Sequence, residues 1–138
     1  MNLLRNLLKK IKLSIFLKKR DRKDAGKIGE NIATKFLTRK GYSILEQNFR
    51  VKGGEIDIIA SKDNTLVFVE VKSRTSTEYG TGEEAVTYTK RKRLILAAKI
   101  YLKYKGEDYN CRFDVIAILF DKTRKAKEIN HIEDAFTL

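Results

Sequence analysis

Residues 52–74 read KGGEIDIIASKDNTLVFVEVKSR and hold two apolar runs separated by a short polar stretch. The runs EIDIIA and TLVFVEVKSR are rich in the Ile, Val and Phe typical of β-strands, and SKDNT between them suits a hairpin loop. We therefore expect two antiparallel strands joined by a loop over Lys62 to Thr65. The same runs also carry charged side chains, which a purely structural hairpin does not require.

Four of these charges fall at positions that a hairpin would bring together. Side chains alternate across a strand, so Glu55 and Asp57 share one face, as do Glu70 and Lys72. With the loop placed as above, Asp57 lies opposite Glu70 and Glu55 opposite Lys72, with Cβ atoms about 4.5–5.5 Å apart. Facing carboxylates repel and raise each other's pKa unless a cation relieves the conflict.

A hard divalent cation fits such a pair of carboxylates. Mg²⁺ is commonly held by one or two carboxylates together with waters and substrate phosphate oxygens. We expect Mg²⁺ or Mn²⁺ on Asp57 and Glu70, with the backbone carbonyl of Val71 as a further candidate ligand. An ammonium at Lys72 would orient an attacking water and balance charge on phosphorus, which indicates phosphodiester hydrolysis. The alternative is a pair of solvated cross-strand charges, Glu55–Lys72 among them.

The flanking sequence predicts helices on both sides of the hairpin. GKIGENIATKFLTRKGY has apolar residues at helical spacing and ends at Gly41, with Gly29 allowing a close approach to the sheet and Glu30 offering a third carboxylate. Residues 83–106 form a second helical region, with Thr87 as a cap and Gly106 at its end. SILEQNFRV, CRFDVIAILF and KEINHIEDAF read as further strands. The order predicts an α/β fold, a mixed β-sheet flanked by helices.

Composition favours a polyanionic partner. The 138 residues carry 30 Lys and Arg against 18 Asp and Glu, a net charge of +12, which points to nucleic acid or anionic lipid. Residues 1–24 form a basic amphipathic leader, a candidate for contact with an anionic membrane or for packing on its own domain. Residues 25–138 form the α/β domain. The one cysteine, Cys111, cannot form an internal disulfide, which fits a cytoplasmic location.

The motifs GENIA, GYSILEQNFR, GGEIDIIA, LVFVEVKSR, RFDVIAI and INHIEDAF occur in that order. In these motifs the chain resembles the YraN-like family of uncharacterised bacterial proteins, within the PD-(D/E)XK (restriction-endonuclease-like) nuclease superfamily. It is more distantly similar to archaeal Holliday-junction resolvases. The resemblance implies a restriction-endonuclease-like core of order α-β-β-β-α-β, and relatives among the resolvases suggest a homodimer.

The resemblance also implies roles for individual residues. Glu30, Asp57 and Glu70 match metal-binding carboxylates, with Ile56 where the superfamily name has proline. Lys72 matches the catalytic lysine. The secondary positions are Glu55, of unclear role beside Lys72, and Lys90, which matches a polar residue near the site in some relatives.

The expected function is divalent-metal-dependent endonuclease cleavage of DNA, with branched or structured DNA as a candidate substrate. Two alternatives remain: a nucleic-acid-binding module of nuclease fold without robust cleavage, and a membrane-associated adaptor acting through the leader. The residues expected to contact nucleic-acid phosphates are Arg74, Lys90, Arg91, Lys92 and Arg93; Tyr79 and Tyr88 are candidates for base stacking. Asp114 is expected to take a strand-end or capping role.

Overall fold

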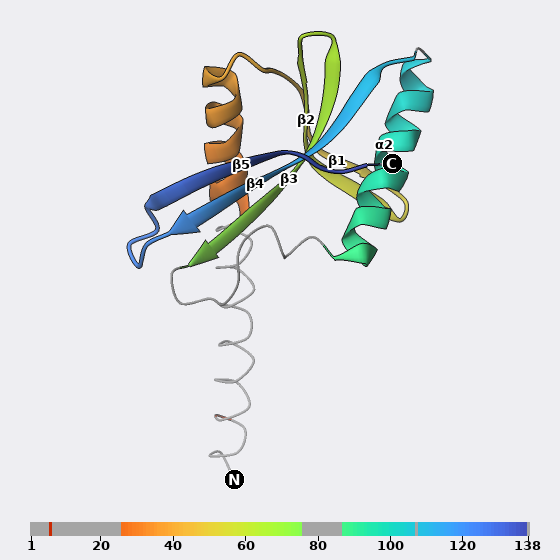
Figure 1. The fold of residues 1–138 in the computed structure, drawn as a ribbon. Coiled ribbons are helices and arrows are strands. Elements are labelled where there is room, and N and C mark those ends of the chain that lie inside the picture. Colours follow the sequence, from red (N-terminus) through yellow and green to blue (C-terminus); the bar gives the residue numbers. More distant parts are fainter. Residues whose placement is uncertain (1–5, 7–25, 76–86, 107, 138) are drawn as a thin grey trace.

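A five-stranded sheet forms the centre of the protein, described by a computed structural model for residues 6, 26–75, 87–106 and 108–137 (Figure 1). A first helix covers residues 26–39. The remaining elements are β1 (Ser43–Val51), β2 (Gly54–Lys62), β3 (Thr65–Thr75), α2 (Tyr88–Lys105), β4 (Asn110–Phe120) and β5 (Ala126–Phe136). The leader expected at residues 1–24 and the stretch 76–86 lie outside the described residues, except for Asn6.

The sheet is mixed, and its strands lie in the order β1-β2-β3-β4-β5. The pairs β1–β2, β2–β3 and β4–β5 are antiparallel, whereas β3 and β4 run parallel along their whole length. A parallel pair needs a crossover connection, and α2 lies in that connection. The α/β fold predicted from the sequence is therefore confirmed, including its order of elements and the closing strand β5.

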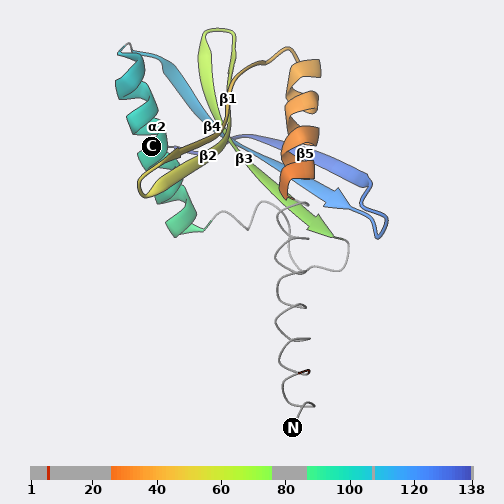
Figure 2. The ribbon, with the colours of Figure 1, turned by 180° about the vertical axis from the view of Figure 1, so that it is seen from behind.

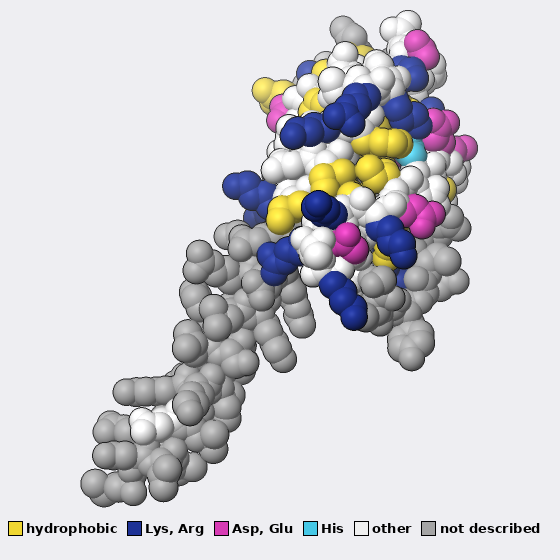
Figure 3. All heavy atoms as spheres, turned by 90° about the vertical axis from the view of Figure 1, so that its left-hand side faces the viewer, with side chains coloured by type: hydrophobic (Ala, Val, Ile, Leu, Met, Phe, Trp, Pro, Cys, Tyr) yellow, Lys and Arg dark blue, Asp and Glu magenta, His cyan; other side chains and the backbone are white. Residues whose placement is uncertain are grey.

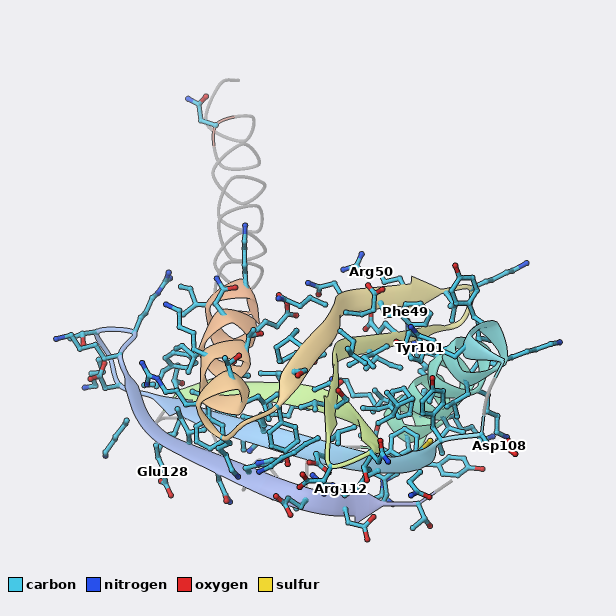
Figure 4. All side chains as sticks on the ribbon, turned by 90° about the horizontal axis from the view of Figure 1, so that it is seen from above. Phe49, Arg50, Tyr101, Asp108, Arg112 and Glu128 are labelled. Atoms are coloured by element: carbon cyan, nitrogen blue, oxygen red, sulfur yellow. The ribbon has the colours of Figure 1, made fainter. Side chains whose placement is uncertain are left out.

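The two helices cover opposite faces of the twisted sheet (Figures 1 and 2). Ala33 and Leu37 of the first helix are fully buried in one apolar cluster with residues of β2, β3 and β4. The other cluster is built around α2, where Tyr101 packs edge-on against Phe49 of β1 at 5.4 Å between ring centroids (Figure 4). Neither described helix combines the length and the apolar character that crossing a membrane would need.

Local signals place the helix ends where the sequence predicted them. The Thr87 side chain accepts a hydrogen bond from the Lys90 N–H at the start of α2. Gly106 ends α2 in the left-handed region at φ 72°, and its N–H donates to the Leu102 carbonyl. Gly41, at φ 91°, allows the Tyr42 N–H to close back on Leu37 at the end of the first helix.

The β2–β3 hairpin turns over two residues, Asp63 and Asn64, both with positive φ of 49° and 60°. Such a turn matches the twist of the flanking strands and suits Asn and Asp. It sets Lys62 opposite Thr65 and continues to Ile58 opposite Val69, the register that the sequence predicted. The backbone pairing ends there, one position short of Asp57 and Glu70.

Asp114 does not lie at a strand end, contrary to expectation, but is fully buried in the interior of β4. Its carboxylate accepts hydrogen bonds from Arg112 at 2.8 and 2.9 Å, from His131 Nε2 at 2.7 Å and from the Asp134 N–H at 3.0 Å. Lys40, which follows the first helix, donates to His131 Nδ1 at 2.8 Å. This network ties β4, β5 and the end of the helix together and leaves no carboxylate oxygen unpaired.

Gly54 marks the closest approach of β2 to α2. A Cβ built on Gly54 would lie 2.5 Å from the Arg93 carbonyl oxygen and 3.2 Å from the Ala97 side chain. Both neighbours belong to the helix core, so neither can move without shifting α2. This approach presses the start of β2, just before Glu55 and Asp57, against the helix that carries Lys90.

Replacing Gly54 by alanine should lower the free energy of unfolding by about 1–3 kcal/mol, the range for overpacking a well-filled site. The control is Gly26→Ala, because nothing lies within 4 Å of a Cβ built there. That variant should be neutral or gain up to about 1 kcal/mol from helix propensity. Chemical denaturation of both variants is the measurement, and equal effects would contradict the packing described for Gly54.

Candidate functional site

A pocket of about 510 Å³ opens where the carboxyl ends of the parallel strands β3 and β4 meet. Ligands in α/β proteins commonly bind at this edge of a sheet. The pocket gathers residues from both helices and from three strands. Its lining residues are Gly26, Ile28, Glu30, Glu55, Asp57, Glu70, Val71, Lys72, Ser73, Arg74, Thr75, Lys90, Phe120, Asp121 and Arg124.

Where the backbone pairing of β2 and β3 ends, the Asp57 side chain replaces a backbone carbonyl as the hydrogen-bond acceptor for β3. Its Oδ2 accepts a hydrogen bond from the Val71 N–H at 2.8 Å. The N–H and C=O of a strand residue point to the same edge, so the Val71 carbonyl also faces this side. The loss of regular pairing opens the hairpin at the position where its acidic residues lie.

The Asp57 carboxyl group is held in an environment that disfavours its charge. Burial comes first and the neighbouring Glu70 carboxylate second, and together they raise the pKa of Asp57 from 3.8 to about 8. The Val71 hydrogen bond opposes this shift without cancelling it, and the charge of Glu30 adds to it. Without a further cation, Asp57 therefore holds a proton at neutral pH.

Glu70 is nearly buried, at 7% exposure, and its cation is Lys90 from the first turns of α2. The Lys90 Nζ lies 3.0 Å from Glu70 Oε1. The Lys90 side chain is 44% exposed, so it reaches the carboxylate from the open side of the pocket. This contact joins the second helix to the end of β3.

Lys72 and Lys90 are neighbours, and one of the two ammonium groups is weakened as a result. Burial first, and then contact with Lys90, lower the pKa of Lys72 to about 8. For Lys90, burial lowers the pKa, but contact with Lys72 and the charge of Glu70 outweigh it, so its pKa lies above the ordinary value. Lys90 is therefore the permanent cation of the pair, and Lys72 can lose its proton near neutral pH.

Glu30 reaches the pocket because the first helix packs tightly on β3. A Cβ on Gly29 would collide with Ser73 Oγ and would lie 3.8 Å from Val71, so only glycine allows this approach without a shift of the neighbouring side chain. The sequence had indicated this role for Gly29. Glu30 is close enough for its charge to raise the pKa of Asp57.

The donor set matches a hard cation in chemistry, with two carboxylates and a backbone carbonyl of Val71 on the same side. In the described part of the chain, no group of three or more His, Cys, Asp or Glu side chains is arranged to hold a metal ion. Glu30 therefore does not complete a three-carboxylate cage in this arrangement. Two carboxylates are nevertheless a usual protein contribution to Mg²⁺, whose other ligands are waters and substrate oxygens.

The structure brings most of the sequence-predicted site residues to this pocket but not all of them. Glu55 lines it, yet among the described residues no ion pair joins Glu55 to Lys72. Arg91, Lys92 and Arg93 do not line the pocket: Arg91 lies over the Phe136 ring and Lys92 over the Tyr88 ring. Tyr79 lies outside the described residues.

The sequence interpretation missed the wall contributed by the end of β4. Phe120 pairs with Thr75, and Asp121 and Arg124 follow in the β4–β5 turn. The signal that could have revealed them is topological, because neighbouring parallel strands end at one edge of a sheet. Asp121 fixes the turn by accepting hydrogen bonds from the N–H groups of Thr123 and Lys125 at 2.8 and 3.0 Å.

Residues 29–118 match the model of UPF0102, described as an uncharacterised protein family. A UPF0102 protein of Pelotomaculum thermopropionicum is 47% identical over 116 residues, covering 83% of this chain and 97% of the relative. One from Clostridium perfringens is 48% identical over 119 residues (86% and 98%), and one from Geotalea daltonii is 50% identical over 121 residues (87% and 94%). The matched range includes every pocket residue named above except Gly26, Ile28, Phe120, Asp121 and Arg124.

Because the pKa of Asp57 is raised in the folded state, Asp57 should lower the free energy of unfolding as pH rises, and Asp57→Asn should remove this effect. Between pH 4 and pH 8 the folded state holds a proton on Asp57 that the unfolded state has released, so stability falls as pH rises. Asparagine cannot ionise. The variant should therefore match wild type near pH 4 and exceed it by at least about 1 kcal/mol at pH 8.

The measurement is urea denaturation from pH 4 to pH 8 in the presence of a chelator. Asp63→Asn is the control, because it makes the same substitution at an exposed turn position. A difference between wild type and Asp57→Asn that does not grow with pH would contradict the buried carboxyl environment.

Proposed function

The chain belongs to the uncharacterised protein family UPF0102, and we propose that it is a divalent-metal-dependent endonuclease that hydrolyses DNA phosphodiester bonds. The observation that carries the proposal is the pocket in which Asp57 and Glu70 meet Lys72 and Lys90. Perturbed pKa values cluster at functional sites, so two neighbouring carboxylates beside a lysine with lowered pKa support this proposal.

Asp57 and Glu70 would hold Mg²⁺ or Mn²⁺, with the Val71 carbonyl on the same edge as a further ligand. The bound cation would polarise a phosphoryl oxygen and acidify a water ligand. Asp57 must give up its proton to take this role. Its pKa of about 8 in the absence of metal predicts that cation binding and proton release occur together near neutral pH.

Lys72 is the candidate that acts on the attacking water. With a pKa of about 8, roughly a tenth of the Lys72 side chains are uncharged amines at pH 7, and that form can accept a proton from the water. Lys90 cannot take the same part, because its pKa is raised and it keeps its proton. The two lysines therefore have different roles. Lys72 would transfer a proton, and the Lys90 ammonium would stabilise the negative charge of the phosphate.

The surroundings of the pocket suit a polyanion. Arg74 and Arg124 line it, and the chain as a whole carries a net charge of +12. Lys and Arg side chains are spread over the face that includes the first helix (Figure 3). Cations of this kind bind phosphate groups whatever the base sequence, which supports DNA as the substrate and predicts little sequence preference. Branched or structured DNA remains a candidate substrate.

A second candidate function is nucleic-acid binding without cleavage. The observation that favours it is the Lys90–Glu70 contact, in which a lysine already provides a cation for one of the two carboxylates. In that case the pocket would bind phosphate through its lysines and arginines and would need no metal. Homodimer formation and membrane contact through residues 1–24 stay predictions.

Lys72→Ala separates the two candidates. In the endonuclease, the variant should keep its fold and its DNA affinity within a few-fold, because one cation among many is lost. Single-turnover cleavage with Mn²⁺ should fall by roughly 10²–10³, the cost of removing one preorganised catalytic group. The control Lys35→Ala removes an exposed lysine from the first helix and should cleave as wild type does.

The substrates for this assay are duplex, single-stranded, flap and four-way-junction DNA, each with Mn²⁺ and with chelator. Metal-dependent cleavage that Lys72→Ala does not reduce would refute the role of the lysine. Binding without cleavage of any substrate under either condition would replace the endonuclease by the binding module.

A further inference from the structure

Helix α2 has an unusual charge for a helix that packs on a hydrophobic core. Its sequence YTKRKRLILAAKIYLKYK contains seven Lys or Arg residues and no Asp or Glu. A surface helix usually mixes both signs, because pairs of opposite charge three or four residues apart stabilise it. The inner side of α2 is ordinary, with Leu94, Ala97, Ala98 and Tyr101 buried. Lys90 pairs with Glu70 in the pocket, and the other six basic residues have no acidic partner on the helix itself.

The outer side of α2 also exposes large apolar side chains in a row. The exposed fractions are 72% for Tyr88, 40% for Leu96, 39% for Ile100 and 85% for Tyr104. These residues are four or eight positions apart, so they form an oblique row across the exposed side of α2, and Tyr88 and Tyr104 lie about 160° apart around the helix axis, at opposite edges of that side. Tyrosine usually buries much of its ring, and two open rings at the ends of one row are not the scattered apolar residues of an ordinary surface. The β1–β2 turn lies beside Leu96, whose Cδ2 would be 3.2 Å from a Cβ built on Gly53.

We propose that the outer face of α2, from Tyr88 to Tyr104, binds a single-stranded segment of nucleic acid by stacking unpaired bases on its tyrosines. The identity of the polymer as nucleic acid rests on the proposed function. Aromatic rings flanked by cations are the general means by which proteins hold single strands without reading their sequence.

The geometry at Tyr88 pairs a ring with an ammonium, as a nucleotide requires. The Lys92 Nζ lies 4.6 Å from the centroid of the Tyr88 ring, one helical turn along α2. The ring is 72% exposed despite this contact, so a base has room to stack while Lys92 faces the adjoining phosphate. At the other end, Tyr104 is 85% exposed, while the Lys105 ammonium lies over the buried Tyr101 ring at 5.5 Å from its centroid.

The pocket lies close to the N-terminal end of α2, on the side of the helix away from Tyr88. Lys90, on the first turns of the same helix, touches Glu70 inside the pocket. At a rise of 1.5 Å per residue, the 16 steps from Tyr88 to Tyr104 span about 24 Å. That is the length of about seven stacked nucleotides at 3.4 Å each. A strand held along α2 would therefore end beside the helical turn that carries Lys90.

Only nucleic acids with unpaired bases can stack on the tyrosine rings of α2. In a duplex the faces of the bases are covered by their neighbours, and the tyrosine rings would meet only the backbone. In a single strand the faces are available at no cost of unpairing. The inference thus narrows the substrate class to nucleic acid with an unpaired segment next to the bond to be cut.

Charge argues against a second copy of the chain as the occupant. A symmetric contact would place two such helices, each with seven positive charges and no negative one, against each other. An anionic lipid surface would also match the charge, but the tyrosines and Leu96 would then act through their apolar character and not through an aromatic face. This difference makes the lipid surface a distinguishable outcome of the test.

The test compares two double variants of the full-length protein, Tyr88→Leu/Tyr104→Leu and Tyr88→Phe/Tyr104→Phe. Leucine keeps the apolar character but removes the aromatic face, whereas phenylalanine keeps the face. The probes are fluorescent oligo-thymidine, an abasic strand with the same number of phosphates, and a duplex, each titrated in chelator so that no cleavage occurs. Circular dichroism of both variants checks that the helix is intact.

Oligo-thymidine should bind the wild type and the phenylalanine variant alike, and the leucine variant about tenfold or more weakly, since one stacked base contributes roughly fivefold to a hundredfold. The abasic strand should bind all three proteins equally and about tenfold more weakly than oligo-thymidine binds the wild type. Equal binding of oligo-thymidine to the leucine variant, or of abasic and base-bearing strands to wild type, would overturn the proposal. So would binding to phosphatidylglycerol vesicles in place of oligo-thymidine.

These outcomes are separate from those of the cleavage assay. A protein that cleaves DNA while its leucine variant binds single strands normally keeps its proposed function and loses this inference. A protein that never cleaves, but binds oligo-thymidine through its tyrosine rings, keeps this inference and loses the endonuclease.

Discussion

The electrostatics of this site depend on two carboxyl groups that lie close together in a poorly solvated pocket. Asp57 and Glu70 meet where the β2–β3 hairpin stops pairing, and the protein balances them in two different ways. Glu70 receives the ammonium of Lys90, and Asp57 holds a proton. The first arrangement draws α2 onto the end of β3. The second leaves a group that can exchange its proton for a cation, and the chemistry proposed for the pocket depends on that exchange.

The rest of the fold positions the residues that surround Asp57 and Glu70. Gly29 and Gly54 let the first helix and α2 approach the hairpin closely enough to present Glu30 and Lys90. The other buried carboxylate, Asp114, provides a contrast. It is fully balanced by Arg112, His131 and a backbone N–H, and its pKa is lowered because these hydrogen bonds outweigh the cost of burial. Asp114, with its pKa lowered, stabilises the contact between β4 and β5, whereas Asp57, with its pKa raised, marks the pocket.

Much of this could be predicted from the sequence, because local signals decide it. The Asp63–Asn64 turn sets the register that brings Asp57 toward Glu70, and alternation along β3 places Lys72 beside them. Contacts between distant elements could not be predicted in the same way. Only the family resemblance singled out Lys90 within KRKR, because the helix phase and the approach at Gly54 decide which lysine faces Glu70. The burial of Asp114 depends on partners in β5 and after the first helix, so its local sequence suggested a strand end instead.

The most direct test of this account is a crystal structure of the protein soaked with Mn²⁺, with anomalous scattering used to locate the ion. The account predicts a peak within ligand distance of Asp57 and Glu70, on the side of the Val71 carbonyl, with the Lys90 ammonium moved away from its position 3.0 Å from Glu70 Oε1. The peak should be absent from crystals of Asp57→Asn. A peak elsewhere with none at the carboxylates, or an unchanged Lys90–Glu70 contact at saturating Mn²⁺, would contradict the claim that this pair of carboxyl groups is a cation site.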